Sequence, residues 1–173
     1  MTLAIAVISG GVDTTRAQLS HGMRLFAEHP AQWDLLAEHP ELAAQAANEM
    51  LRFEPITPFT ARVAVEDVEY RGVTFPEGSL LFACAETANR DPSAFERPDE
   101  FDITVDRGRT PILTFGFGDH FCLGAQLARM ELAETFAFLA PRMRGLRLDG
   151  DPRYGSIIGI YPMESLPLAF EPP

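Results

Sequence analysis

The alternation of apolar and polar positions predicts a helical first part of the chain. Apolar residues recur at helical spacing over residues 2–28, although Gly10 and Gly11 interrupt the pattern. Two shorter helical stretches follow, and each is opened by a His-Pro pair. Proline suits the first turn of a helix because its missing N–H would be unpaired there. We therefore expect helices over 2–28, 31–38 and 41–53, with His29 and His39 as helix boundaries rather than ligands.

Beyond Pro55 and Pro58 the pattern changes to short runs rich in β-branched and aromatic residues. These runs predict strands, which we place at 59–65, 68–70, 73–75, 79–84, 146–148, 156–161 and 166–170. Between the two groups of strands, a segment over 123–139 is apolar on most sides and predicts a buried helix. The expected fold is mainly α with small β-sheets, an α+β arrangement. Trp33 and Leu36 are expected in its core because they share one helix face.

Composition and net charge restrict the classes of function and partner that we expect. The 173 residues are enough for one domain with a hydrophobic core, and the net charge of −11 disfavours nucleic acid as a partner. No apolar run reaches membrane-spanning length and no basic leader stands at the N-terminus, so we expect no membrane span and a cytoplasmic location. We interpret Cys84 as a small core residue and expect no disulfide with Cys122.

The other cysteine ends a glycine-spaced loop. We expect an extended apolar segment at 111–115, then the loop, then the helix that follows Cys122. Glycines at 116, 118 and 124 let the backbone turn or lie close to a flat ligand. A sulfur placed just before a helix is favoured as thiolate, which suits either a metal ligand or a nucleophile with His120 as its base.

The spacing Phe-x-x-Gly-x-x-x-Cys-x-Gly is matched at Phe115, Gly118, Cys122 and Gly124. It resembles the signature of the cytochrome P450 haem-thiolate monooxygenases. The resemblance implies haem b with Cys122 as axial iron ligand, Gly116 beside it, and insertion of one oxygen atom from O2 into a substrate. It extends over nearly the whole chain, which is similar to the C-terminal haem-binding portion of that fold, a single partial domain over 1–173.

The stretch from Gly10 to Thr15 is similar to the family motif on the oxygen side of the haem. The resemblance implies that Thr14 stabilises bound oxygen and that Asp13 takes part in proton delivery. Without that context, a mid-helix threonine such as Thr14 more often bonds back to an upstream carbonyl.

Glu49 and Arg52 meet on one helix face at i,i+3 spacing. In the family such a Glu-x-x-Arg pair is buried and links this helix to the loop beneath the haem. Glu100 stands where the family often has arginine, so either Arg97 or Arg107 is expected to complete the network.

The same resemblance assigns Arg62 and His120 to the haem propionates, and Pro58, Phe59 and Ile158 to the substrate pocket. It implies a ferredoxin or flavoprotein as electron donor, and we expect a small apolar organic substrate. Family members carry a larger N-terminal portion, so a missing N-terminal half is an expected partner. The alternative is a haem-binding remnant, or half of a split oxygenase, without activity of its own.

Overall fold

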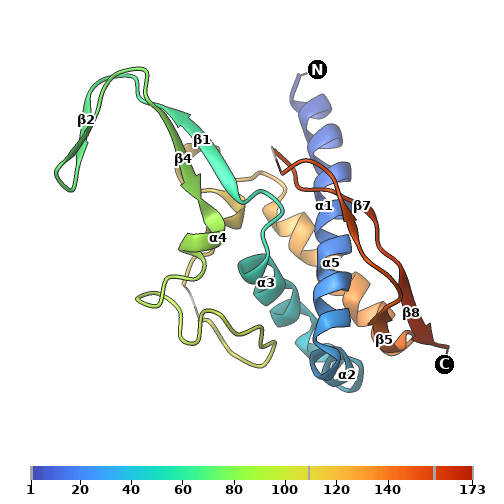
Figure 1. Cartoon of the computed structure of the whole chain (residues 1–173). Helices are drawn as coiled ribbons and strands as arrows, with labels where there is room; N and C mark the ends of the chain where they lie inside the picture. Colours follow the sequence, from blue (N-terminus) through green and yellow to red (C-terminus); the bar gives the residue numbers. More distant parts are fainter. Residues whose placement is uncertain (1, 109, 158, 173) are drawn as a thin grey trace.

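The protein, a computed structural model, is described over residues 2–108, 110–157 and 159–172 (Figure 1). Its body is helical, and a long two-stranded ribbon projects from one side of that body (Figure 1). The helices of the first part are α1 (Thr2–Glu28), α2 (Pro30–Glu38) and α3 (Ala43–Phe53). All three predicted helices are confirmed, and the third is preceded by a 3₁₀ turn at Pro40–Leu42.

Strands within the described residues pair as four antiparallel two-stranded sheets. The pairs are β1 (Phe59–Val63) with β4 (Leu80–Cys84), β2 (Val68–Tyr70) with β3 (Val73–Phe75), β5 (Arg144–Leu148) with β8 (Leu168–Glu171), and β6 (Arg153–Tyr154) with β7 (Met163–Ser165). The ribbon in Figure 1 is the β1–β4 pair, with the β2–β3 hairpin at its tip. Arg71 and Gly72 both have positive φ, as a tight two-residue hairpin turn requires.

The predicted strand at 156–161 is wrong for the residues that the structure describes. These residues form a turn between β6 and β7, closed by the Gly155 amide donating to the carbonyl of Pro162 at 2.9 Å. Gly159 has a φ of +89°, which breaks a regular strand. The extended segment expected at 111–115 is also shorter than predicted, because Leu113–Phe115 forms a 3₁₀ turn closed by the Gly116 amide.

The core lies where α1, α2, α3 and α5 (Ala125–Leu139) meet. The ring of Phe26 lies 5.0 Å from that of Trp33 and 5.2 Å from that of Phe136, and all three side chains are fully buried. Leu36 is fully buried as well, so the core positions predicted for Trp33 and Leu36 are confirmed.

Two burial predictions need correction. The α5 helix buries only one face, with Leu132 and Phe136 inside while Leu127 and Met130 are more than half exposed. The helix therefore carries more apolar side chains than the described part of the chain buries. Cys84 lies in β4 and is only partly buried, with Sγ 3.1 Å from Oγ1 of Thr87, because both faces of the projecting ribbon are open. Cys84 and Cys122 are both free thiols, as predicted.

Candidate functional site: a cysteine loop at the start of a helix

The loop before α5 is folded back on itself by backbone hydrogen bonds. The Cys122 amide donates to the carbonyl of Phe115 at 2.9 Å, and the Phe121 amide donates to that of Gly118 at 3.0 Å. Gly116 and Gly118 have φ values of +72° and +70°, a region that other residues rarely occupy. The two glycines thus allow the double turn, including the 3₁₀ turn Gly118–His120, that brings Cys122 to the surface.

The surroundings of the thiol fit a flat apolar group held by sulfur. Cys122 is exposed, and so are the neighbouring side chains of Phe117 and Leu123, at 76% and 75%. A Cβ added at Gly118 would meet no atom within 4 Å, so the backbone faces open space there. A single exposed thiol among exposed apolar side chains leaves this surface open to a flat apolar ligand.

His120 and Cys122 make no hydrogen bond to each other within the described part of the chain. Both are exposed, and His120 is the last residue of the 3₁₀ turn rather than part of a strand, in which residues i and i+2 would face the same side. The structure therefore does not bring these two side chains together as a nucleophile and its base. The described residues also contain no group of three or more His, Cys, Asp and Glu side chains arranged around a metal position.

The residues expected on the oxygen side lie in the first half of α1. The Thr14 hydroxyl donates to the carbonyl of Gly10, one turn earlier, and the side chain is partly exposed. Asp13 is exposed, and its Oδ1 accepts from Arg16 at 3.2 Å. The two adjacent glycines of this half of α1, Gly10 and Gly11, face open space, since an added Cβ would meet no atom within 4 Å.

Arg62 is exposed on β1, and its guanidinium donates to the carbonyl of Ala61. His120 is also exposed. The two side chains can therefore donate hydrogen bonds to acidic groups of a ligand. Pro58 is buried just before β1 and Phe59 is 45% exposed, whereas Ile158 lies outside the described residues. Pro58, Ile157 and Tyr161 line a cavity of about 300 Å³ between α1, the end of α3 and the β6–β7 turn.

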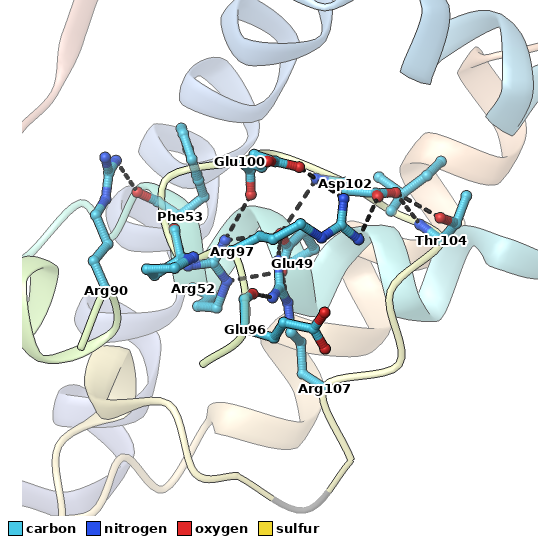
Figure 2. A network of polar contacts seen from close by, with 12 residues as sticks. Glu49, Arg52, Phe53, Arg90, Glu96, Arg97, Glu100, Asp102, Thr104 and Arg107 are labelled. Carbon is cyan, nitrogen blue, oxygen red and sulfur yellow. Dashed lines mark hydrogen bonds and ion pairs between the residues drawn. The ribbon is translucent and has the colours of Figure 1, made fainter. Parts of the chain in front are cut away.

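Glu49 and Arg52 form a buried, bidentate ion pair, drawn in Figure 2. Arg52 Nε lies 2.8 Å from Oε2 of Glu49, and Nη2 lies 2.8 Å from Oε1. The two side chains are 0% and 1% exposed. The remaining Arg52 donors reach carbonyls of the 89–100 segment, namely Asn89 at 3.0 Å, Pro98 at 2.7 Å and Glu100 at 3.0 Å. The pair therefore fastens α3 to the long loop that leads to Cys122.

The second cation of this network is Arg107. Its Nη2 lies 2.8 Å from Oε1 of Glu49, and its Nε lies 3.1 Å from Oε2 (Figure 2). Arg97 instead pairs with the carboxylates of Glu100 and Asp102 nearer the surface. Burial alone would raise the pKa of the Glu49 carboxyl, but hydrogen bonds and charge from Arg52 and Arg107 hold it below its ordinary value of 4.5.

Sequence reasoning missed Asn89, a fully buried side chain that supports the start of the cysteine loop. Its Oδ1 accepts from the Leu113 amide at 2.7 Å, and its Nδ2 donates to Oγ1 of Thr114 at 2.9 Å. Thr114 in turn donates to the carbonyl of Leu51 at 2.6 Å. A lone Asn beside a short helical turn carries no sequence signal for a partner 24 residues away.

Comparison with known proteins places this geometry in a family. The family model described as Cytochrome P450 matches residues 31–142. Luteothin monooxygenase of Streptomyces thioluteus is 46% identical over 170 residues, which take in 98% of this chain and 42% of the relative. The biotin biosynthesis cytochrome P450 of Bacillus subtilis (strain 168) is 43% identical over the same share of each chain.

Comparison with solved structures leads to the same family. The crystal structure of P450BioI in complex with an acyl carrier protein ligated to hexadec-9Z-enoic acid superposes with a TM-score of 0.86 at 41% identity, and covers 94% of this chain and 42% of its own. CalO2 superposes with a TM-score of 0.89 at 37% identity, over 97% of this chain and 42% of its own. The chain thus spans about 42% of the length of these relatives. None of the helices among the described residues combines the length and apolarity needed to cross a bilayer. With a matching family model and close relatives along almost its whole length, the chain belongs to the cytochrome P450 family, and its fold is a part of the cytochrome P450 fold.

Proposed function

We propose that residues 1–173 form the haem-binding portion of a haem-thiolate monooxygenase, with Cys122 as the axial ligand of haem b. The observation that carries the proposal is the exposed Cys122 thiol on a loop fixed by the Phe115 carbonyl and opened by Gly116 and Gly118. When bound, the haem supplies oxygen activation, and electron donation from the thiolate favours O–O cleavage.

Residues of this chain have distinct parts in the proposal. Arg62 and His120 are exposed donors that would hold the two propionates, because a guanidinium or imidazole N–H matches a carboxylate. Phe115, Gly116, Gly118 and Gly124 would shape the backbone that holds the haem. Glu49 and Arg52, joined by Arg107, keep the polypeptide below the ligand sulfur in place.

Proton handling is assigned to α1. Thr14 Oγ1 carries the hydroxyl proton, which the Gly10 carbonyl accepts in this structure. Asp13 lies next to it in the sequence, exposed and paired with Arg16, so its carboxylate reaches solvent. Electrons would come from a ferredoxin or flavoprotein, and the co-substrates would be O2 and a small apolar organic molecule bound beside Pro58, Phe59 and Ile158.

Haem titration into the purified chain tests the ligand. We expect the reduced, CO-treated complex to show the red-shifted Soret band of thiolate ligation. Cys122→Ser should lose this band, while Cys84→Ser, which removes the other free thiol, should keep it. An imidazole-like or free-haem spectrum for the unmodified chain would show that Cys122 is not the ligand.

A second candidate function is a haem-binding module that requires the rest of a P450-length polypeptide for turnover. It is favoured by the exposed apolar side chains on the first half of α1, where Ile8 is 69% and Val12 is 63% exposed. Thiolate-type haem binding without substrate-dependent consumption of reductant would support this candidate. Turnover restored by adding a separately expressed N-terminal portion of a relative would identify it as half of a split oxygenase.

A further inference from the structure

His21 is a fully buried histidine in α1, and an acceptor faces each of its ring nitrogens. Nε2 lies 2.9 Å from the carbonyl oxygen of Tyr161, and Nδ1 lies 2.6 Å from Oε1 of Glu54. A carbonyl oxygen and an ionised carboxylate can accept but cannot donate. Both contacts are hydrogen bonds donated by the ring only if each ring nitrogen carries a proton, as in an imidazolium.

The charges around the ring support this state. Burial alone would raise the pKa of Glu54, but the hydrogen bond from His21 and the charge of Arg24 hold it below its ordinary value of 4.5, so the carboxylate is ionised. Arg24 pairs with both Glu54 and Glu28, so Arg24 and an imidazolium at His21 would be balanced by two carboxylates. The other groups facing the imidazole are the rings of Tyr154 on β6 and of Tyr161, at 5.9 and 5.3 Å between centroids.

The same place joins two segments that are far apart in the sequence. The Tyr161 amide donates to the carbonyl of Ile56 at 2.8 Å. Gln18, one turn before His21, accepts from the Ile56 amide at 3.3 Å and donates to the carbonyl of Glu54 at 2.8 Å. We call these five residues, Gln18, His21, Glu54, Ile56 and Tyr161, the His21 junction.

The His21 junction adjoins both segments that the proposed function places beside the substrate. Ile56 precedes Pro58 by two residues, and Tyr161 lies with Ile157 between β6 and β7. Pro58, Ile157 and Tyr161 line one cavity, together with Glu54. A displacement at the junction would therefore move both walls relative to α1.

We propose that His21 is a positioning residue for the substrate side of the site: as an imidazolium, it fixes residues 54–58 and the 155–161 turn against the helix that carries Asp13 and Thr14. The inference rests on the proposed function, because it takes these two segments as substrate walls. A neutral His21 would present a bare nitrogen to one of its two acceptors and would lose its hydrogen bond to that segment.

The first measurement needs no substitution. Nitrogen-15 NMR of the labelled chain near neutral pH is expected to show His21 with protons on both ring nitrogens. A signal from one protonated and one bare nitrogen would mean that Glu54 carries the proton, and it would overturn the inference.

The second measurement compares His21→Phe with the matched control His39→Phe, since His39 is exposed and lies outside the junction. Amide exchange in residues 155–161 should become about tenfold to a hundredfold faster in His21→Phe, the effect of losing a hydrogen bond to a charged group. Exchange in α5 should stay unchanged, and His39→Phe should match the unmodified chain in both regions. Equal acceleration in α5 and in 155–161 would reveal general destabilisation and overturn the positioning role.

Haem loading separates the two proposals. His21→Phe should keep the thiolate-type Soret band, because the junction acts on the substrate walls and not on the Cys122 loop. Loss of that band in His21→Phe would contradict the inference, whereas its absence in the unmodified chain would contradict the proposed function and leave the NMR and exchange results to decide the role of His21.

Discussion

Arg107 and Glu49 are 58 residues apart in the sequence, yet Nη2 of Arg107 lies 2.8 Å from Oε1 of Glu49. With Arg52 on the same carboxylate, one buried anion is shared by two guanidinium groups (Figure 2). The shared carboxylate connects α3 to the 89–107 segment, so the path of that segment depends on three charged side chains.

Substitutions in this network should therefore lower the free energy of unfolding by different amounts. Arg52→Leu leaves Glu49 half-paired and several buried carbonyls without a donor, and should lower the free energy of unfolding by about 3–5 kcal/mol. Arg107→Leu leaves the Arg52 pair intact and should cost about 1–3 kcal/mol. The control Arg97→Leu removes only the exposed contacts to Glu100 and Asp102, and should cost less than about 1 kcal/mol. Urea unfolding of the three variants checks this order, and equal costs for Arg97→Leu and Arg107→Leu would contradict it.

The pH dependence of stability has a definite sign at Glu49. Its pKa in the folded chain is lower than the ordinary value of 4.5, so its contribution to stability is fully present above that pH. The contribution is lost as the pH falls through the folded-state pKa, because the protonated carboxyl no longer balances two cations. Glu49→Gln should thus destabilise the chain near neutral pH, and the difference from the unmodified chain should shrink as the pH is lowered.

Unfolding curves between neutral pH and about pH 3 measure that difference. Glu66→Gln is the matched control, since Glu66 is exposed, and it should leave the curve unchanged. A gap between Glu49→Gln and the unmodified chain that stays constant with pH would rule out the ion pair as its source.

The sequence predicts what depends on local patterning. Helix limits at residues 28, 38 and 53 follow from proline and apolar periodicity, and the β2–β3 hairpin follows from Arg71-Gly72. The strand predicted at 156–161 is wrong because an apolar run alone does not reveal a turn. Gly155 and Pro162 close that turn through a single backbone hydrogen bond.

Contacts between distant segments are beyond such reasoning. The choice between Arg97 and Arg107 as partner of Glu49 depends on how the 95–107 loop folds, and both are arginines at plausible spacing. Burial on α5 could not be predicted either, because an apolar face indicates that something covers it and not that the covering lies within these 173 residues.

Thr14 offers a test of the proposed proton handling that is separate from folding. Among the described residues its hydroxyl donates to the Gly10 carbonyl alone, one turn earlier, a contact that a helix does not need for stability. Thr14→Val, of similar shape, should change the free energy of unfolding by less than about 0.5 kcal/mol and leave haem binding intact. Product formation in haem-loaded protein supplied with an electron donor should fall about a hundredfold, as for loss of a general acid. Thr14→Ser keeps the hydroxyl and should retain most of the activity, so equal losses in both variants would argue against a role for that group.

Two glycines of α1 should respond in opposite ways to the same substitution. A Cβ at Gly22 would lie 2.6 Å from Cζ of Phe136, so α1 and α5 approach each other through the missing side chain. Gly22→Ala should lower the free energy of unfolding by about 1–3 kcal/mol, since overpacking outweighs the better helix propensity of alanine. Gly11→Ala meets no atom within 4 Å and should instead raise it by up to about 1 kcal/mol. The double variant Gly22→Ala with Phe136→Leu separates packing from propensity, because the shorter side chain makes room for the new methyl group. Its cost should be smaller than the sum of the two single substitutions, and strict additivity would show that Gly22 is not the contact point between the two helices.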